Sequence, residues 1–355
     1  MAGDANRPDR RRFLQSLGAG ALAVTGCSSS CGSTHADLPQ TTMVATKIEA
    51  ARAQLTAGKP RVVVVRTKKA LLKNGRDAGY DADRGALRAM LDAGLVTLSG
   101  QKDASSALAK YFRPGERVGL KVNGLAGRKA ATHVELVDEL SLLLSKANIE
   151  GRQQIVFDRF ARDLTVSGFS SQARGYRCIG NDESGHEDEL VQMPSSASRL
   201  TRVLTTHVDA MLNLPILKQH MLAGITGALK NNFGCIHNPN KMHLDNCDPY
   251  IAEVNAVPEI RGKQRLVVMD ALRPVVDNGP AYQPGMAEVA NVLLFATDLV
   301  AADTVGLGII ENLRAKRELP TLANAGMAPT YLATASKMGL GVSDRAGIDI
   351  VTIEV

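Results

Sequence analysis

The sequence predicts an α/β fold with a largely parallel sheet flanked by helices on both faces. Short β-branched or apolar runs alternate along the chain with longer segments whose apolar residues recur at helical spacing. Strands separated by helices of about ten to twenty residues indicate a largely parallel sheet. The 355 residues, 45% of them hydrophobic, suffice for one large domain built from aliphatic side chains.

The expected strands are short apolar runs that end at turn residues or charges. The run Val62-Val63-Val64-Val65, bounded by Pro60 and Lys68, is typical of a buried strand. In chain order, the expected strands are 61–66, 116–122, 154–157, 209–217, 265–269, 289–296 and 348–353. Cys178 is expected to be an inert strand residue.

The expected helices show helical spacing of apolar residues together with start or stop signals. They cover 82–97, 104–112, 133–146 and 299–317. Pro114-Gly115 ends the second, whereas Thr132 and Asp298 are expected as the N-caps of the third and fourth. The ligand site of such a sheet is expected at the carboxyl ends of its strands.

The N-terminal 27 residues have the layout of a twin-arginine export signal. Arg10-Arg11 precede Phe13-Leu14 and a short Gly/Ala-rich apolar stretch, which is too short to span a bilayer. The segment 24–27 (VTGC) resembles a lipobox, so Cys27 is expected to be lipidated; cleavage after Ala36 is the alternative. Residues 28–42 are expected to be a flexible tether and 43–355 a single α/β domain. The predicted location is periplasmic or otherwise extracytoplasmic, with the twin-arginine translocase and the membrane, through Cys27, as partners.

Composition argues against a nucleic-acid partner. The net charge is +6, and removing residues 1–26, which hold four arginines and two acids, lowers it to about +4. The chain has no tryptophan and only 4% aromatic residues, so stacking platforms for single strands are not expected.

Polar residues follow several predicted strands. Lys121 and Asn123 end one strand and His133 starts the next helix, while Lys218 and Asp270 lie at the ends of two others. Three lysines near strand ends predict a positive pocket for a carboxylate or phosphate. The candidate catalytic residues are Lys218, His220, His133, Lys230 and Asp270, and the candidate substrate-binding residues are Lys121, Asn123, Thr226 and Asn231.

The segment 218–237 (KQHMLAGITGALKNNFGCIH) is interpreted as a turn and helix that form one wall of this pocket. Lys218 would hold the anion with help from Thr226, and His220 would be a general acid or base, or a metal ligand. Lys230 would either point into the pocket or leave its head in water. The glycines at 224 and 227 do not form a P-loop, no G-x-G-x-x-G follows a strand, and no ferredoxin-type C-x2-C-x2-C run occurs.

The segment 235–247 concentrates metal-ligating side chains. Cys235, His237, His243 and Cys247 have the spacing C-x-H-x5-H-x3-C, and such donors suit zinc, copper or iron. A disulfide between the two cysteines and two simply buried thiols are the alternatives.

Three segments together resemble the family called domain of unknown function 362. They are Lys121-Val122-Asn123 with Thr132-His133; 213–218 with His220, Thr226-Gly227, Lys230-Asn231 and 233–235; and 297–303. Asp270-Ala271 and Gly279-Pro280 also fit the pattern, whereas Leu217 and Gln219 depart from it. The resemblance runs from about Arg61 to the C-terminus and implies the fold and the motif positions, but no reaction.

Two functions are therefore expected from the sequence. The first is an exported enzyme that acts on a small anionic substrate in a Lys/His-lined pocket, with metal assistance as one form of it. The second is a non-enzymatic lipoprotein that binds a metal or a small ligand and supports a redox system.

Overall fold

The central element is a ten-stranded mixed sheet. The computed structural model describes residues 58–73, 80–170 and 175–355. The predicted export signal, Cys27, the tether and residues 43–57 lie outside the described residues. Within the part described, no helix is long and apolar enough to cross a membrane.

Most neighbouring strands of the sheet run parallel. Eight strands follow the order β14-β1-β13-β12-β9-β4-β5-β6, and β10 pairs with β11 and β12. Only β13 on the main path is antiparallel to its neighbours. The strands are β1 (Arg61–Arg66), β4 (Val118–Lys121), β5 (Gln154–Asp158), β6 (Arg177–Gly180), β9 (Ala210–Asn213), β10 (Ile216–His220), β11 (Gly224–Thr226), β12 (Gln264–Val275), β13 (Val292–Ala296) and β14 (Asp349–Glu354). Two small hairpins pair β2 (Leu71–Lys73) with β3 (Tyr80–Ala82), and β7 (Val191–Met193) with β8 (Ser196–Ser198).

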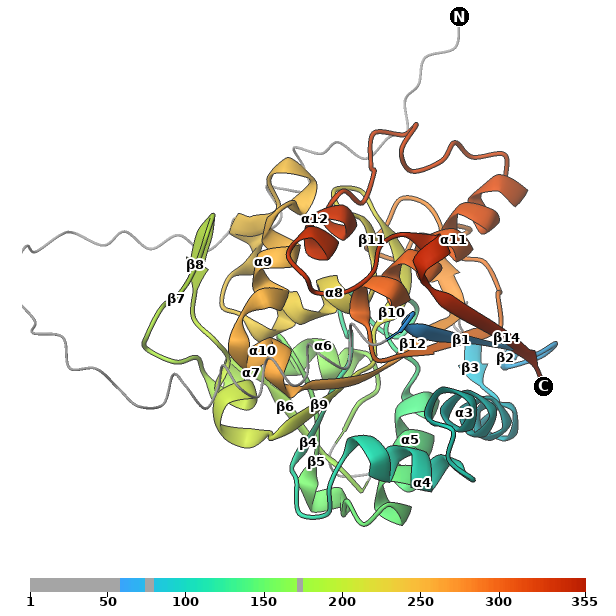
Figure 1. Ribbon diagram of the computed structural model, residues 1–355, viewed down its shortest axis with the longest axis vertical. Helices are drawn as coiled ribbons and strands as arrows, with labels where there is room; N and C mark the ends of the chain where they lie inside the picture. Colours follow the sequence, from blue (N-terminus) through green and yellow to red (C-terminus); the bar gives the residue numbers. More distant parts are fainter. Residues whose placement is uncertain (1–57, 74–79, 171–174) are drawn as a thin grey trace, which may run out of the picture. The chain divides into compact units, whose positions relative to one another are not determined.

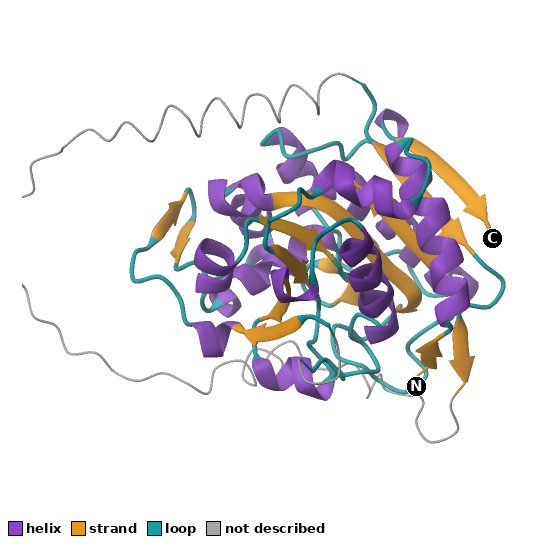
Figure 2. Cartoon of the chain, turned by 90° about the horizontal axis from the view of Figure 1, so that it is seen from below, coloured by secondary structure: helices purple, strands orange, loops and turns teal. Residues whose placement is uncertain are grey.

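Helices cover both faces of the sheet (Figures 1 and 2). On one face lie α3, α4 and α5, and on the other lie α8 to α12 (Figure 1). The helices are α3 (Arg84–Ser99), α4 (Ala104–Tyr111), α5 (Val134–Lys146), α6 (Ala161–Val166), α7 (Asn181–Ser184), α8 (Ala228–Asn231), α9 (Tyr250–Ala256), α10 (Pro258–Lys263), α11 (Leu299–Lys316) and α12 (Tyr331–Lys337). Short helical turns are η1 (Gly151–Gln153), η2 (Val203–His207), η3 (Asn232–Cys235), η4 (Pro239–Met242), η5 (Asp245–Cys247) and η6 (Arg345–Gly347).

Successive side chains of each strand point to opposite faces of the sheet, so both sets of helices pack on an apolar layer. Val268 belongs to the core cluster beneath α3 to α5, whereas the next residue, Met269, contacts α11 at Gly306. On the other side, α3 approaches the sheet so closely that a Cβ at Gly94 would lie 2.2 Å from the Phe295 ring. The predicted α/β class with helices on both faces is thereby confirmed.

Three predicted elements differ in the structure. The expected strand 265–269 is longer, because β12 runs through Asp270 to Val275. The expected strand 209–217 is two strands, β9 and β10, because Pro215 lacks an N–H and the chain changes neighbours there. The N-cap of α5 is His133 and not Thr132, and its side chain makes no capping bond. The Thr132 hydroxyl instead donates to Leu214 O at 2.7 Å and accepts from Asn123 N–H at 3.0 Å. Asp298 caps α11 as predicted, accepting from Ala301 N–H.

Candidate functional site

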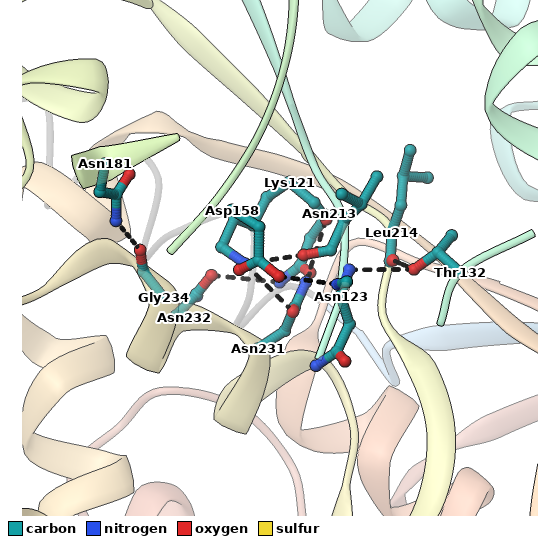
Figure 3. A network of polar contacts seen from close by, with 12 residues as sticks. Lys121, Asn123, Thr132, Asp158, Asn181, Asn213, Leu214, Asn231, Asn232 and Gly234 are labelled. Carbon is teal, nitrogen blue, oxygen red and sulfur yellow. Dashed lines mark hydrogen bonds and ion pairs between the residues drawn. The ribbon is translucent and has the colours of Figure 1, made fainter. Parts of the chain in front are cut away.

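Lys121 is the centre of a buried polar network at the carboxyl end of β4 (Figure 3). Its ammonium lies 2.7 Å from Asp158 Oδ1, 2.7 Å from Val122 O and 3.3 Å from Asn231 Oδ1. The second carboxylate oxygen of Asp158 accepts from Gly124 N–H at 2.7 Å. Lys121 is fully buried, so the ion pair and the two neutral oxygens together replace its hydration.

Asparagine side chains extend this network across the sheet (Figure 3). Asn231 Nδ2 donates to Lys121 O and to Asn213 Oδ1, and Asn213 Nδ2 donates to Ala228 O. A Cβ at Gly234 would lie 2.6 Å from the Lys121 ammonium, so only glycine fits against it. The network therefore fixes the segment 228–234 against the ends of β4, β5 and β9.

Lys218 is also fully buried, but its partners are neutral. Its ammonium lies 3.1 Å from Asn123 Oδ1, 3.1 Å from Leu125 O and 3.0 Å from Ala130 O. These three oxygens belong to the loop between β4 and α5, so Lys218 pins that loop to β10. Burial lowers the pKa of Lys218 to about 7; the negative charge of Asp158 opposes this shift and the positive charge of Lys230 adds to it.

These contacts change the interpretation of the lysines. From the sequence, Lys121 and Lys218 are expected as cations that face an anionic ligand, with Lys218 on a turn. In the structure Lys218 lies within β10, and each ammonium is surrounded by three oxygens of the protein. Because an ammonium has three N–H groups, the geometry of both lysines matches a positioning role. Thr226 and Asn231, expected in substrate binding, are buried as well, and Asn123 uses its Oδ1 to accept from Lys218.

His133 and Asp270 form a buried dyad at the start of α5. Both the backbone N–H and the ring Nδ1 of His133 lie within hydrogen-bond distance of Asp270 Oδ2, at 2.8 and 2.7 Å. Asp270 is fully buried, the His133 side chain is 10% exposed, and Leu272 N–H occupies Asp270 Oδ1. A carboxylate at Nδ1 selects the tautomer with Nδ1–H, which places the ring lone pair on Nε2. The sequence placed both residues at one edge of the sheet, and they are in direct contact. Asp270 does not end its strand as expected, because β12 continues to Val275.

Basic side chains neighbour this dyad along the chain. Lys129 precedes His133 in the same loop, and Arg273 follows Asp270 on β12 by three residues, about 10 Å of strand. Both cations lie against the ring of Tyr282, at 5.6 Å for Lys129 and 5.4 Å for Arg273. Arg273 also lies 3.5 Å from the Tyr282 hydroxyl. Tyr282 thus contacts one cation from the β4–α5 loop and one from β12.

His243 and Lys230 form a second histidine site, in which the ring contacts a cation instead of a carboxylate. The ring Nδ1 of His243 lies 3.0 Å from Pro239 O, so Nδ1 carries the proton and Nε2 accepts from the Lys230 ammonium at 3.1 Å. Burial and the Lys230 charge lower the pKa of His243 to about 3. Lys230 lies 4.3 Å from the Phe233 ring centroid and 3.9 Å from Cys247 Sγ, so its head is not in water as one alternative expected.

His220 stacks on His243, with ring centroids 5.8 Å apart. Its Nδ1 accepts the backbone N–H groups of Leu222 and Ala223, so the ring proton resides on Nε2. Burial, reinforced by Lys230, lowers the pKa of His220 well below its usual value. The ring therefore stays neutral, and Nδ1 is used to hold the β10–β11 turn.

The four expected metal ligands do not form one cluster. No three His, Cys, Asp or Glu side chains converge to hold a metal ion in the part of the chain that the structure describes. Cys235 lies near Lys121 and Asp158, His237 contacts His186, and His243 and Cys247 lie at Lys230. Cys235 ends η3, His243 follows η4 and Cys247 ends η5, so these donors lie on separate turns of the chain. Cys235 and Cys247 are free, buried thiols, and burial raises the pKa of Cys235 to about 12.

Two carboxylates that organise the site were not among the candidate site residues, although Asp303 belongs to the segment 297–303 that resembles the family. Asp158 ends β5 and neutralises Lys121. Asp303, inside α11, accepts the N–H groups of Ala228 and Leu229 at 2.5 and 3.1 Å, and burial raises its pKa to about 7. A Cβ at Gly227 would lie 2.2 Å from Asp303, so this glycine admits the carboxylate. The position of Asp158 directly after a buried strand was the available signal for the first of them.

Comparisons with known proteins give a family but no reaction. A family model described as "Domain of unknown function (DUF362)" matches residues 118–308, a little more than half of the chain. No curated protein matches the sequence. A crystal structure of a protein from Thermotoga maritima aligns with a TM-score of 0.36 and 9% identity, over 72% of this chain and 59% of that one. The chain thus spans less than two thirds of that protein.

Proposed function

Because the chain belongs to the domain of unknown function 362 family, whose description names no reaction, we propose a function from the geometry of the dyad. The protein is an enzyme that uses His133 as a general acid–base on a small anionic substrate, with Asp270 as the orienting carboxylate. It is exported by the twin-arginine pathway and held at the membrane by a lipid on Cys27, as its N-terminal sequence predicts. The observation that carries the catalytic proposal is the double contact of Asp270 Oδ2 with the backbone and ring of His133.

The geometry supports proton transfer at one defined atom. The Asp270 carboxylate accepts the Nδ1 proton of His133, so Nε2 is the nitrogen that takes a proton from substrate. The imidazolium that forms is stabilised by the buried carboxylate 2.7 Å away and can return its proton to the product. Leu272 N–H and His133 N–H keep the carboxylate in place throughout.

The surroundings favour an anionic substrate. Lys129 brings positive charge to the loop that leads to His133, Arg273 brings it to the strand that carries Asp270, and Tyr282 contacts both cations. Lys218 holds the β4–α5 loop by hydrogen bonds to two of its carbonyl oxygens, so it positions His133 without contacting substrate. In this proposal the catalytic set predicted from the sequence reduces to His133 and Asp270, and the lysines support them.

Incubation of the purified protein in D2O with a mixture of small carboxylates and phosphate esters tests the proposal across the whole substrate class. Proton and phosphorus NMR would detect turnover or solvent exchange of any component. We expect His133→Asn and Asp270→Asn to lower the rate of that change by about a thousandfold or more, since the base or its orientation is lost. Asp209→Asn, which removes an exposed carboxylate, is the matched control and should remain active.

Two results would count against this proposal. Conversion that persists in a folded His133→Asn variant would remove the dyad from the chemistry. Stoichiometric binding without conversion of any component would favour the non-enzymatic ligand-binding lipoprotein instead.

A further inference from the structure

A second group of basic side chains gathers where β5 and β6 end, apart from the dyad. Two isolated bridges, His186↔Thr201 and Leu200↔Ile236, lay three short segments of the chain side by side. His237 N–H donates to Arg199 O at 2.8 Å within this arrangement. His186, Arg199 and His237 therefore come together although they are distant in sequence.

The two histidines of this group contact each other. Their ring centroids are 4.9 Å apart and the rings meet edge to face. Nε2 of His186 is buried, and among the described residues it has no hydrogen-bond partner. A buried ring nitrogen without a partner is costly in a folded protein and indicates a group that completes it.

Arg159 brings a guanidinium to the same place. It follows β5 directly, is half-buried over the ring of Phe160 at 4.7 Å, and donates to Asn240 Oδ1 at 3.2 Å. Burial lowers the pKa of Arg159, and the negative charges of Asp158 and Asp163 oppose this shift.

The charges that act on the two histidines are positive. Burial lowers the pKa of His186, and His237, Arg159, Arg199 and Arg202 lower it further. Burial likewise lowers the pKa of His237, with further contributions from Arg199, Lys241 and Arg159. A field of this sign repels a metal cation and attracts an anion, so His237 is better placed for an anion than for the metal expected from its sequence.

The nearby carboxylates are engaged by other donors. The segment 182–189 contains five acids. Their contacts are Asp182 with Ala161 N–H, Glu183 with Gly180 N–H, Glu187 with the Thr205 hydroxyl and Arg202, and Asp188 with Arg202. Four of the five acids are thus used to fix the local backbone or to pair with Arg202.

We infer that Arg159, His186, Arg199 and His237 form a binding site for a phosphate-type oxyanion at the carboxyl ends of β5 and β6. Guanidinium groups match the geometry of tetrahedral oxyanions, and an imidazole Nε2–H supplies a further donor. The carboxyl edge of a parallel sheet is where such ligands bind in α/β proteins. The ligand is inorganic phosphate or the phosphoryl group of a small molecule.

Titration calorimetry with inorganic phosphate at constant low ionic strength tests the site. We expect one phosphate per chain, with binding weakened about tenfold in each of Arg159→Gln and Arg199→Gln, because each removes a charge-assisted hydrogen bond. Arg199 is exposed, so its substitution leaves the fold intact even if Arg159→Gln destabilises it. Arg152→Gln removes an equal charge from an exposed pair, with 79% of its side chain accessible, and should bind phosphate as the parent does.

Ring NMR signals give an independent measurement. Phosphate should shift the signals of His186 and His237 and leave that of His207 in place. Stronger binding of glycerol 3-phosphate than of phosphate would assign the site to a phosphorylated metabolite, and the reverse order to free phosphate. Absence of saturable binding of any of these anions, or an equal loss in Arg152→Gln, would overturn the inference. His133→Asn should retain phosphate binding, so this result is separable from the fate of the catalytic proposal.

Discussion

Lys121 and Lys218 are both fully buried, but the protein stabilises their ammonium groups with different partners. Each ammonium has three protein oxygens, but one of the three at Lys121 belongs to the carboxylate of Asp158, whereas all three at Lys218 are neutral. At Lys218 burial dominates and lowers the pKa to about 7. The comparison teaches that a lysine near a strand end is not by itself evidence for an anionic ligand, since the protein can supply all of its partners.

Removing the Asp158 carboxylate should destabilise the folded protein, because Lys121 loses its counter-charge. Asp158→Asn leaves a buried ammonium without a counter-charge, so we expect the free energy of unfolding to fall by about 3–5 kcal/mol. Urea unfolding followed by circular dichroism measures this loss. The double variant Lys121→Met/Asp158→Leu removes both charges and should lose less than Asp158→Asn. A larger loss in the double variant would show that packing, and not charge, carries the effect.

The pH dependence of the free energy of unfolding should reveal the lowered pKa of Lys218. The folded pKa of about 7 lies below the ordinary value of 10.5, so between these values the unfolded chain binds a proton that the folded chain has released. Stability should therefore rise with pH, by about 2 kcal/mol from pH 7 to pH 9, relative to Lys218→Met. Urea unfolding of both proteins across this range provides the measurement. If the free energies of unfolding of the parent and Lys218→Met changed equally with pH, the three oxygens would be keeping Lys218 charged.

An exposed ion pair provides the smallest effect and a baseline for the two buried lysines. Arg117 and Asp209 form a 2.7 Å pair whose side chains are 46% and 41% exposed, and the Arg117 hydrogen bond lowers the pKa of Asp209 to about 2. Because water screens the pair, Asp209→Asn should cost less than about 1 kcal/mol in urea unfolding. A loss as large as that of Asp158→Asn would contradict the distinction drawn between buried and exposed charges.

The parts of the fold with strong local signals were predictable from sequence. The Val62–Val65 run forms β1, and the cap Asp298 starts α11 where expected. Short strands such as β7 and β8 were missed because three residues carry too little periodicity. The division of the expected strand 209–217 at Pro215 was not predicted, because the apolar run continues through this proline.

The site was predictable in position but only partly in chemistry. Strand-end reasoning brought His133 and Asp270 to the same edge, and they are in contact, although β12 continues past Asp270 to Val275. It could not assign partners to the lysines, because Asp158 is 37 residues from Lys121 and Asn123 is 95 residues from Lys218. Donor spacing in 235–247 was a poor guide for the same reason, since the direction of each side chain depends on turns that only the fold defines.

The bond from Gly124 N–H to Asp158 Oδ2 makes one backbone amide dependent on the buried ion pair. Deuterium can replace the proton of that amide only when the carboxylate moves away, and the carboxylate also holds the Lys121 ammonium. The exchange rate of a single glycine amide thus reports how often the interior of this sheet edge opens to water.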